Sequence, residues 1–220
     1  MSIKKIFLKY NIFSRIRIKR LQQRLRNKDI TILSSNCLGG LIYHELGLEF
    51  LSPTVNLRFS SPDFVKFICD MEHYLEFEFA QINSEELYPV ALLDDIVVHL
   101  VHYHSMREAI DAWNRRKKRI NRDNIFVILN DCDGMSKNEL EKLKNCKIKN
   151  ICVFTAQKYP EYPFCFHILQ FKDKESVGNT MKKNILTGEM VIEKEFDFVG
   201  WFNQDSGSCL ESYRRKKYMG

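Results

Sequence analysis

The sequence lacks an uninterrupted apolar segment of about 20 residues, which is the length that a membrane-spanning helix needs. Lysines interrupt its first eleven residues and no small-residue cleavage site follows them, so we expect no secretory signal peptide. It has only five prolines and nine glycines among 220 residues, and it contains neither a low-complexity linker nor an internal repeat. We therefore expect a cytoplasmic protein with one substantial domain.

Paired cysteine spacings are also missing from the sequence. The seven cysteines are an odd number at irregular intervals, which fits neither a disulfide framework nor a zinc site. In a chain without signs of export, we interpret all seven as reduced thiols. Most free cysteines are small buried residues, so a thiol becomes a candidate for chemistry only where its surroundings are polar and turn-like. Cys37 lies in such a stretch.

Acidic residues are absent from the first 28 positions, where ten of the 34 lysines and arginines lie. The rest of the chain carries 24 basic and 28 acidic side chains, so the positive charge is concentrated at the N-terminus. Apolar residues recur there at steps of three and four, which predicts a basic amphipathic helix over residues 3–27. We expect residues 1–28 to lie on an anionic membrane surface and residues 29–220 to form a single α/β domain.

The N-terminal helix has two other possible uses. It can pack against the body of the protein, or it can bind nucleic acid or an acidic partner. The body of the chain has no helix-turn-helix, no zinc spacing and no basic-aromatic surface pattern. We therefore expect no nucleic acid partner.

Apolar β-branched runs alternate with amphipathic segments in the remainder of the chain. Strands are predicted over residues 30–33, 96–104, 124–130, 148–154 and 164–171, and helices over residues 61–75 and 105–120 and from Ser136 onward. This alternation predicts a three-layer α/β/α domain with a mixed, mainly parallel sheet, preceded by the basic amphipathic N-terminal helix.

Polar residues follow four of the predicted strands. The four clusters are Asn36-Cys37, His102-Tyr103-His104, Asp131-Cys132-Asp133, and Thr155 with Lys158 and Tyr159. Because the carboxyl ends of parallel strands meet at one edge of a sheet, we expect these clusters to converge. A thiol, an imidazole and a carboxylate from separate strands are the components of a nucleophile, its base and the group that orients the base.

Cys37 is the candidate nucleophile, because it lies where a predicted strand turns into a helix. The unpaired N–H groups at the start of that helix would stabilise a thiolate, and those of Gly39 and Gly40 would stabilise an oxyanion on the substrate. Asn36, Gly39, Gly40 and Tyr43 are candidate substrate contacts. The structural alternative is that Cys37 only packs and that the glycines only permit the turn.

The candidate base is His102, or alternatively His99, and the candidate orienting residue is Asp131 or Asp133. Each has a structural alternative. His99 can be a hydrogen-bonded core residue, and an Asp-Gly sequence is ordinary turn chemistry. The two aspartates also form an Asp-x-Asp pattern, which can hold a divalent cation.

Basic residues are concentrated in the predicted helix over residues 105–120. Arg115, Arg116 and Arg119, together with Lys158, are candidates to bind the phosphate of a substrate. Such a run is also typical of a solvated helix face. Arg115 and Arg119 are an (i, i+4) pair and Arg116 lies on the apolar side of the helix, so we expect at least one of these guanidinium groups to point inward at a carboxylate or a bound anion.

A family resemblance joins these motifs. They are Asn36-Cys37-x-Gly39-Gly40 with Tyr43, Ser52-Pro53-Thr54, Tyr88-Pro89-Val90, Asp95-Ile96 with His99 and His102-Tyr103, the segment from Trp113 to Asn124, and Asp131-x-Asp133-Gly134. In these motifs, over residues 29–203, the sequence resembles an uncharacterised bacterial family. Members of that family are labelled exopolysaccharide biosynthesis proteins and occur among capsule genes. That resemblance implies a three-layer α/β/α domain and brings no established activity. Cys132 departs from the usual residue of this family.

A second resemblance concerns the first loop. The Ser-Asn-Cys loop, followed later by an Arg-rich helix, resembles the arrangement in uncharacterised papain-like bacterial proteins. This resemblance implies that Asn36-Cys37 is at the nucleophile position.

Together these observations predict a cytoplasmic protein of surface-polysaccharide biosynthesis, peripheral on the inner face of the cell membrane. We expect a transferase with a Cys-His acyl-transfer site that acts on a lipid-linked or nucleotide sugar. One alternative is a metal-dependent enzyme similar to glycosyltransferases that use Asp-x-Asp. Another is a non-catalytic module that binds a glycan or a protein partner. The sequence identifies no cofactor.

Overall fold

A computed structural model of the protein describes residues 3–215, with side chains from residue 12 onward. Its centre is a four-stranded sheet in which all neighbouring strands are parallel, in the order β1-β5-β6-β7. The strands are β1 (Thr31–Ser34), β5 (Ile125–Asn130), β6 (Asn150–Thr155) and β7 (Cys165–His167). This arrangement confirms the predicted mainly parallel sheet and places the ends of β1, β5 and β6 at one edge.

A second sheet is small and antiparallel. It consists of β2 (Ala80–Ile82), β3 (Val90–Leu93) and β4 (Ile96–His99), in sequence order. The predicted strand over residues 96–104 is wrong beyond His99. The ladder stops there because Pro89, which accepts the Leu100 N–H, has no N–H of its own to donate, and the chain then turns as the Leu100 carbonyl accepts the Tyr103 N–H. His102 therefore lies in a turn of the hairpin sheet and not at a strand end of the central sheet.

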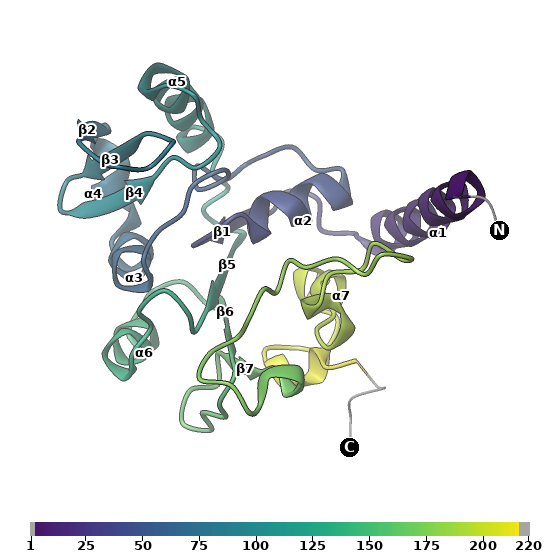
Figure 1. Ribbon diagram of the computed structural model, residues 1–220. Helices are drawn as coiled ribbons and strands as arrows, with labels where there is room; N and C mark the ends of the chain where they lie inside the picture. The colour runs from purple at the N-terminus through teal and green to yellow at the C-terminus, as the bar shows by residue number, and fades with distance from the viewer. Residues whose placement is uncertain (1–2, 216–220) are drawn as a thin grey trace.

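Helices cover both faces of the central sheet, as Figure 1 shows. On one face lie α1 (Ile3–Arg24), α2 (Leu38–Leu46) and α7 (Phe198–Asn203), and on the other α3 (Ser61–Cys69), α4 (Met71–Glu76), α5 (Met106–Lys117) and α6 (Lys137–Lys144). Three short 3-10 turns, η1 (Leu169–Phe171), η2 (Ile192–Lys194) and η3 (Leu210–Tyr213), complete the elements. The predicted three-layer α/β/α arrangement is confirmed.

The alternation of side chains along β5 explains why two separate cores form. Val127 and Leu129 are buried on the face with α3 to α6, while Phe126 and Ile128 are buried on the face with α2 and α7. A strand that is apolar on both faces needs a helical layer on each, which the chain supplies. The predicted helix over 61–75 is interrupted at Asp70, whose φ of −136° is outside the helical range.

The C-terminal half of α1 packs against the body. Leu21 and Leu25 are buried, and the Arg17 guanidinium donates hydrogen bonds to the carboxylates of Glu45 and Glu193. Gln22 donates to the Glu45 carbonyl at 2.9 Å. Among the helices of residues 3–215, none combines the length and the apolar character that crossing a membrane requires.

Candidate functional site

Cys37 occupies the turn between β1 and α2, as the sequence predicts. Its backbone has φ −67° and ψ −6°, and its carbonyl accepts the Leu41 N–H at 3.1 Å. Asn36 supports the turn because its Oδ1 accepts the Leu38 N–H at 3.0 Å. The Cys37 side chain is half-buried, so its thiol is held in place and can still be reached.

Two glycines let α2 start close to the sheet. A Cβ on Gly39 would lie 2.9 Å from the Cβ of Ser34, and one on Gly40 would lie 3.3 Å from Cγ1 of Val55. Both glycines are in the first turn of α2, where backbone N–H groups have no partner one turn earlier in the helix. The close packing against Ser34 and Val55 therefore requires small residues at positions 39 and 40. The backbone N–H groups of these two glycines lie in the first turn of α2, directly after Cys37.

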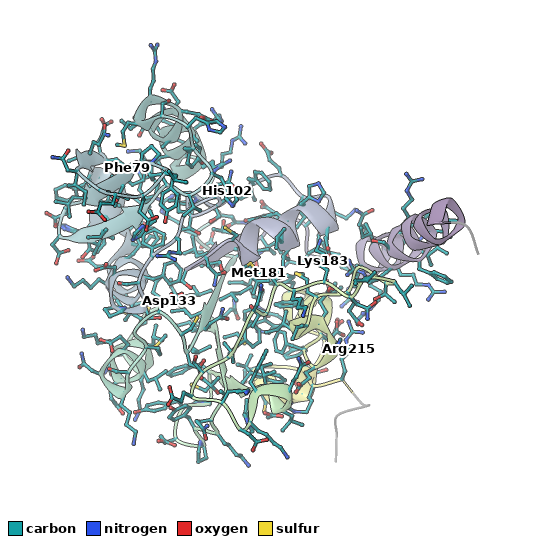
Figure 2. All side chains as sticks on the ribbon, in the orientation of Figure 1. Phe79, His102, Asp133, Met181, Lys183 and Arg215 are labelled. Carbon is teal, nitrogen blue, oxygen red and sulfur yellow. The ribbon has the colours of Figure 1, made fainter. Side chains whose placement is uncertain are left out.

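The thiol of Cys37 meets the imidazole of His102. Sγ lies 3.1 Å from Nε2, which joins residues 65 positions apart in the sequence. His102 is exposed, and Figure 2 shows it between the small sheet and α2. The contact brings together the predicted nucleophile and the predicted base. A thiol and an imidazole at this distance can exchange a proton directly.

Arg58 is a further member of the site that the sequence reasoning missed. Arg58 and His99 face each other across a two-stranded bridge, in which each N–H donates to the other residue's carbonyl at 2.9 Å. The next residue, Phe59, donates its N–H to Ser35 at 2.9 Å, which places this segment beside the Cys37 turn. Burial raises the pKa of the Cys37 thiol, and the positive charge of Arg58 opposes that rise.

A sequence signal for Arg58 was present. It is the only lysine or arginine between Asp29 and Val65, and it alternates with the apolar residues Leu57 and Phe59. An isolated cation on the open face of such a segment indicates a specific use.

Replacing Arg58 by glutamine is expected to lower the alkylation rate of Cys37 at pH 7 by roughly threefold and to shift the rate profile to higher pH. The reason is that removing the nearby positive charge leaves only burial to act on the pKa of the thiol, and burial raises it. Iodoacetamide labelling followed by peptide mass spectrometry measures this rate. An unchanged profile would show that Arg58 does not act on the thiol.

His99 stands apart from the thiol. Its Nδ1 is buried and without a hydrogen-bond partner, and its ring packs edge-on against Tyr88 with centroids 6.0 Å apart. Burial lowers the pKa of His99, and the charge of Arg58 lowers it further. His99 is therefore held as a neutral imidazole next to Arg58, and among residues 12–215 no hydrogen bond joins it to Cys37.

Asp131 and Asp133 have other partners than an imidazole. The two oxygens of Asp131 accept the N–H groups of Ala156 and Val177, each at 2.6 Å. Burial raises the pKa of Asp131, which these two N–H donors oppose. Asp133 is exposed, has a φ of 57° and accepts the Ser61 N–H at 2.8 Å through its carbonyl. Within residues 12–215 no hydrogen bond or ion pair joins either aspartate to His102.

The predicted substrate contacts differ in their surroundings. The Tyr43 hydroxyl is buried between the Ile30 carbonyl and the Ile32 N–H, at 2.9 and 2.7 Å, where it holds α2 to β1. Arg116 points inward, as expected, but it donates to the Val55 carbonyl at 2.8 Å and the Tyr103 hydroxyl at 2.7 Å. Both bonds use Nη1, and within residues 12–215 no carboxylate forms an ion pair with Arg116.

The other three basic residues of the predicted site are at the surface. Arg119 forms an ion pair with Glu49, whereas Arg115 and Lys158 are exposed. They are available to a charged substrate and to solvent alike. Of the predicted site, the structure thus brings Cys37, His102, Asn36, Gly39 and Gly40 into one place.

Comparison with known proteins places this chain among proteins of unknown function. The family model described as "Domain of unknown function (DUF1919)" matches residues 8–203. An uncharacterized protein from Haemophilus influenzae is 34% identical over 183 residues, which are 83% of this chain and 88% of that protein. The family match spans β1 to α7 of this chain and so includes the positions of Cys37 and His102.

Proposed function

Since the chain belongs to the DUF1919 family of unknown function, we propose its function from the site: thiol-dependent acyl transfer in surface-polysaccharide biosynthesis, with Cys37 as nucleophile and His102 as base. The observation that carries this proposal is the 3.1 Å contact between Sγ and Nε2. The proposed pathway rests on the resemblance of the sequence motifs to proteins labelled exopolysaccharide biosynthesis proteins. A lipid-linked or nucleotide sugar is the proposed acceptor.

The first half of the reaction forms a thioester. Sγ of Cys37 attacks the acyl carbonyl carbon of the donor while Nε2 of His102 accepts the thiol proton. The N–H groups of Gly39 and Gly40, at the positive end of α2, stabilise the oxyanion. When the tetrahedral intermediate collapses, the bond to the leaving group breaks and His102 donates the proton to that group.

The second half of the reaction regenerates the thiol. A hydroxyl of the sugar attacks the thioester carbonyl, and Nε2 of His102 accepts the hydroxyl proton. Collapse of this intermediate releases the acylated sugar, and His102 returns the proton to Sγ. The imidazole therefore acts as base and acid in turn, which requires that it contact the sulfur directly.

Substitution of Cys37 by alanine is expected to reduce surface polysaccharide to the amount made when the gene is deleted. The test complements a deletion strain with the wild-type chain or with a variant, and quantifies extracted surface polysaccharide. Cys209→Ala is the matched control, because Cys209 is an exposed thiol far along the chain from the site. Its polysaccharide should remain at the wild-type amount.

The fold must be shown to survive in the same experiment. A half-buried thiol replaced by alanine should shift the melting temperature by only a few degrees, roughly 2–4 °C. A Cys37→Ala chain that is folded and still supports full polysaccharide production would refute the thiol mechanism. That result would favour the binding-module alternative, in which the same surface holds a glycan without chemistry.

The metal-dependent alternative has less support from the contacts. In the part of the chain that the structure describes, no group of three or more His, Cys, Asp and Glu side chains is arranged to hold a metal ion. Both oxygens of Asp131 are already used by backbone N–H groups. Inhibition of the protein's activity by EDTA, together with loss of that activity in Asp133→Ala, would favour the metal-dependent alternative over the thiol mechanism.

A further inference from the structure

The outward face of α1 carries apolar side chains that nothing in the described structure covers. Ile12, Phe13 and Ile16 are exposed, with between 43% and 50% of their surface accessible. At 3.6 residues per turn they lie on the side of the helix opposite to Leu21 and Leu25, which are buried against the body. The helix is therefore attached by one face and presents the other to its surroundings.

Basic residues accompany this apolar stripe. Arg15, Lys19 and Arg20 are exposed on the same outward half of α1. Arg17, by contrast, is turned inward to Glu45 and Glu193. Since no acidic residue occurs before Asp29, the outward face has positive charge only. Apolar side chains flanked by uncompensated cations are the pattern of a helix that lies in the interface of an anionic bilayer.

A second segment adds apolar side chains beside α1. The backbone reverses between Asn184 and Glu189, and its tip exposes Ile185 and Leu186, with 71% and 60% of their surface accessible. The Asn184 side chain fixes the tip because its Oδ1 accepts the Leu186 N–H at 2.8 Å. The tip is therefore a hydrogen-bonded turn that presents two apolar side chains.

Contacts hold this tip against α1. Arg17 Nε donates to the Thr187 carbonyl at 3.2 Å, and a Cβ on Gly188 would lie 2.6 Å from Oγ of Ser14. Gly188 has a φ of 67°, so a glycine suits both the turn and the close approach. Figure 1 shows the segment that precedes α7 reaching α1, which projects from the side of the domain.

We propose that the outward face of α1 docks on an anionic phospholipid bilayer, with the exposed apolar tip at Ile185 and Leu186, which is attached to the inner side of α1, at the margin of this surface. The apolar side chains enter the headgroup region and the cations pair with lipid phosphates. A second copy of the chain fits this surface poorly, because two such faces would bring like charges together without an acidic partner. The inference does not depend on the chemistry at Cys37.

Vesicle sedimentation with the full chain tests the proposal. Vesicles of phosphatidylglycerol mixed with phosphatidylcholine should bind the protein, and raised salt or pure phosphatidylcholine should release it. The double variant Phe13→Glu/Ile16→Glu should bind these vesicles at least about tenfold more weakly. Each glutamate replaces an apolar side chain that would enter the bilayer by a negative charge that the anionic lipid repels. Ile185→Glu should weaken binding in the same direction.

The control variant is Leu87→Glu, which puts the same charge on a fully exposed leucine in the small-sheet region and should bind as the wild type does. Neutralising the cations in Lys19→Gln/Arg20→Gln provides a test that leaves the apolar stripe intact, and it should reduce binding about tenfold. Wild-type protein that fails to bind anionic vesicles at low salt would overturn the proposal. Equal binding by the wild type and the Phe13→Glu/Ile16→Glu variant would also overturn it.

Discussion

In the His102→Ala variant, the rate at which iodoacetamide alkylates Cys37 at pH 7 should fall about 100-fold, the usual contribution of a positioned general base. Burial raises the pKa of the Cys37 thiol, so without help the sulfur stays protonated at neutral pH. The imidazole 3.1 Å away is the group that can take the proton. The measurement is the isotope-coded labelling rate of the peptide that contains Cys37.

His104→Ala is the matched control for this prediction. His104 is two residues from His102 and is also exposed, and its backbone N–H donates to the Glu108 carboxylate at 3.2 Å. The Cys37 rate should be unchanged in that variant. If both histidine variants kept the wild-type rate, the contact between Sγ and Nε2 would have no chemical role and Cys37 would be a packing residue.

Replacing Arg17 by alanine should lower the free energy of unfolding by about 3–5 kcal/mol, which is the usual result of removing one partner from a buried ion pair. Arg17 donates to both oxygens of Glu193 at 2.7 and 2.9 Å and to Glu45 at 2.8 Å. Both carboxylates are almost fully buried, with 5% and 3% of their side chains exposed. Lys183 still pairs with Glu45 in the variant, whereas Glu193 keeps no other ion pair among the described residues and only the charge of Arg215 still acts on it.

The destabilisation in Arg17→Ala should depend on pH. Burial raises the pKa of Glu193 to about 7, above the value in the unfolded chain. The proton on Glu193 therefore stabilises the fold at acidic pH, and that contribution is lost as the pH rises through about 7. Without Arg17, the free energy of unfolding should fall more steeply as the pH rises through this range. Urea unfolding should therefore show a larger difference in free energy between the wild type and Arg17→Ala at pH 8 than at pH 5.

Two further variants complete this test. Arg20→Ala removes an exposed cation from the same helix and should change the free energy of unfolding by less than about 0.5 kcal/mol. Adding Glu193→Gln to Arg17→Ala should restore part of the stability at pH 8, because the buried group is then neutral. Equal stability of the wild type and Arg17→Ala at both pH values would contradict the ion-pair account of how α1 is attached.

The architecture followed from hydrophobic patterning. Residues 125–129 of β5 are an unbroken apolar run, and such a run needs cover on both faces, which predicted the three layers correctly. The error in the small sheet has a physical reason. The segment 96–104 begins with three β-branched residues and has a fourth at Val101, and its histidines and Tyr103 are compatible with a strand, so nothing local marks the end of β4 at His99. That end is set by pairing with β3, which is a tertiary contact.

The site was predictable in its residue types and only partly in its contacts. The strand-to-helix turn marked Cys37, and the histidines marked the segment that meets it. Asp131 shows the limit, since its carboxylate is used by the N–H of Val177, a partner 46 positions away that no local pattern indicates. Arg116 points inward, and its acceptors are the Val55 carbonyl and the Tyr103 hydroxyl, partners 61 and 13 positions away that no local pattern indicates.

The central claim is that His102 makes Cys37 a nucleophile, and the most direct test compares two thiols within one wild-type molecule. Cys37 is half-buried and Cys209 is exposed, so access and burial alone would make Cys37 the slower to react. If the imidazole accepts its proton, Cys37 should be alkylated at pH 7 at least about tenfold faster than Cys209. Alkylation of Cys37 more slowly than Cys209 would contradict the claim.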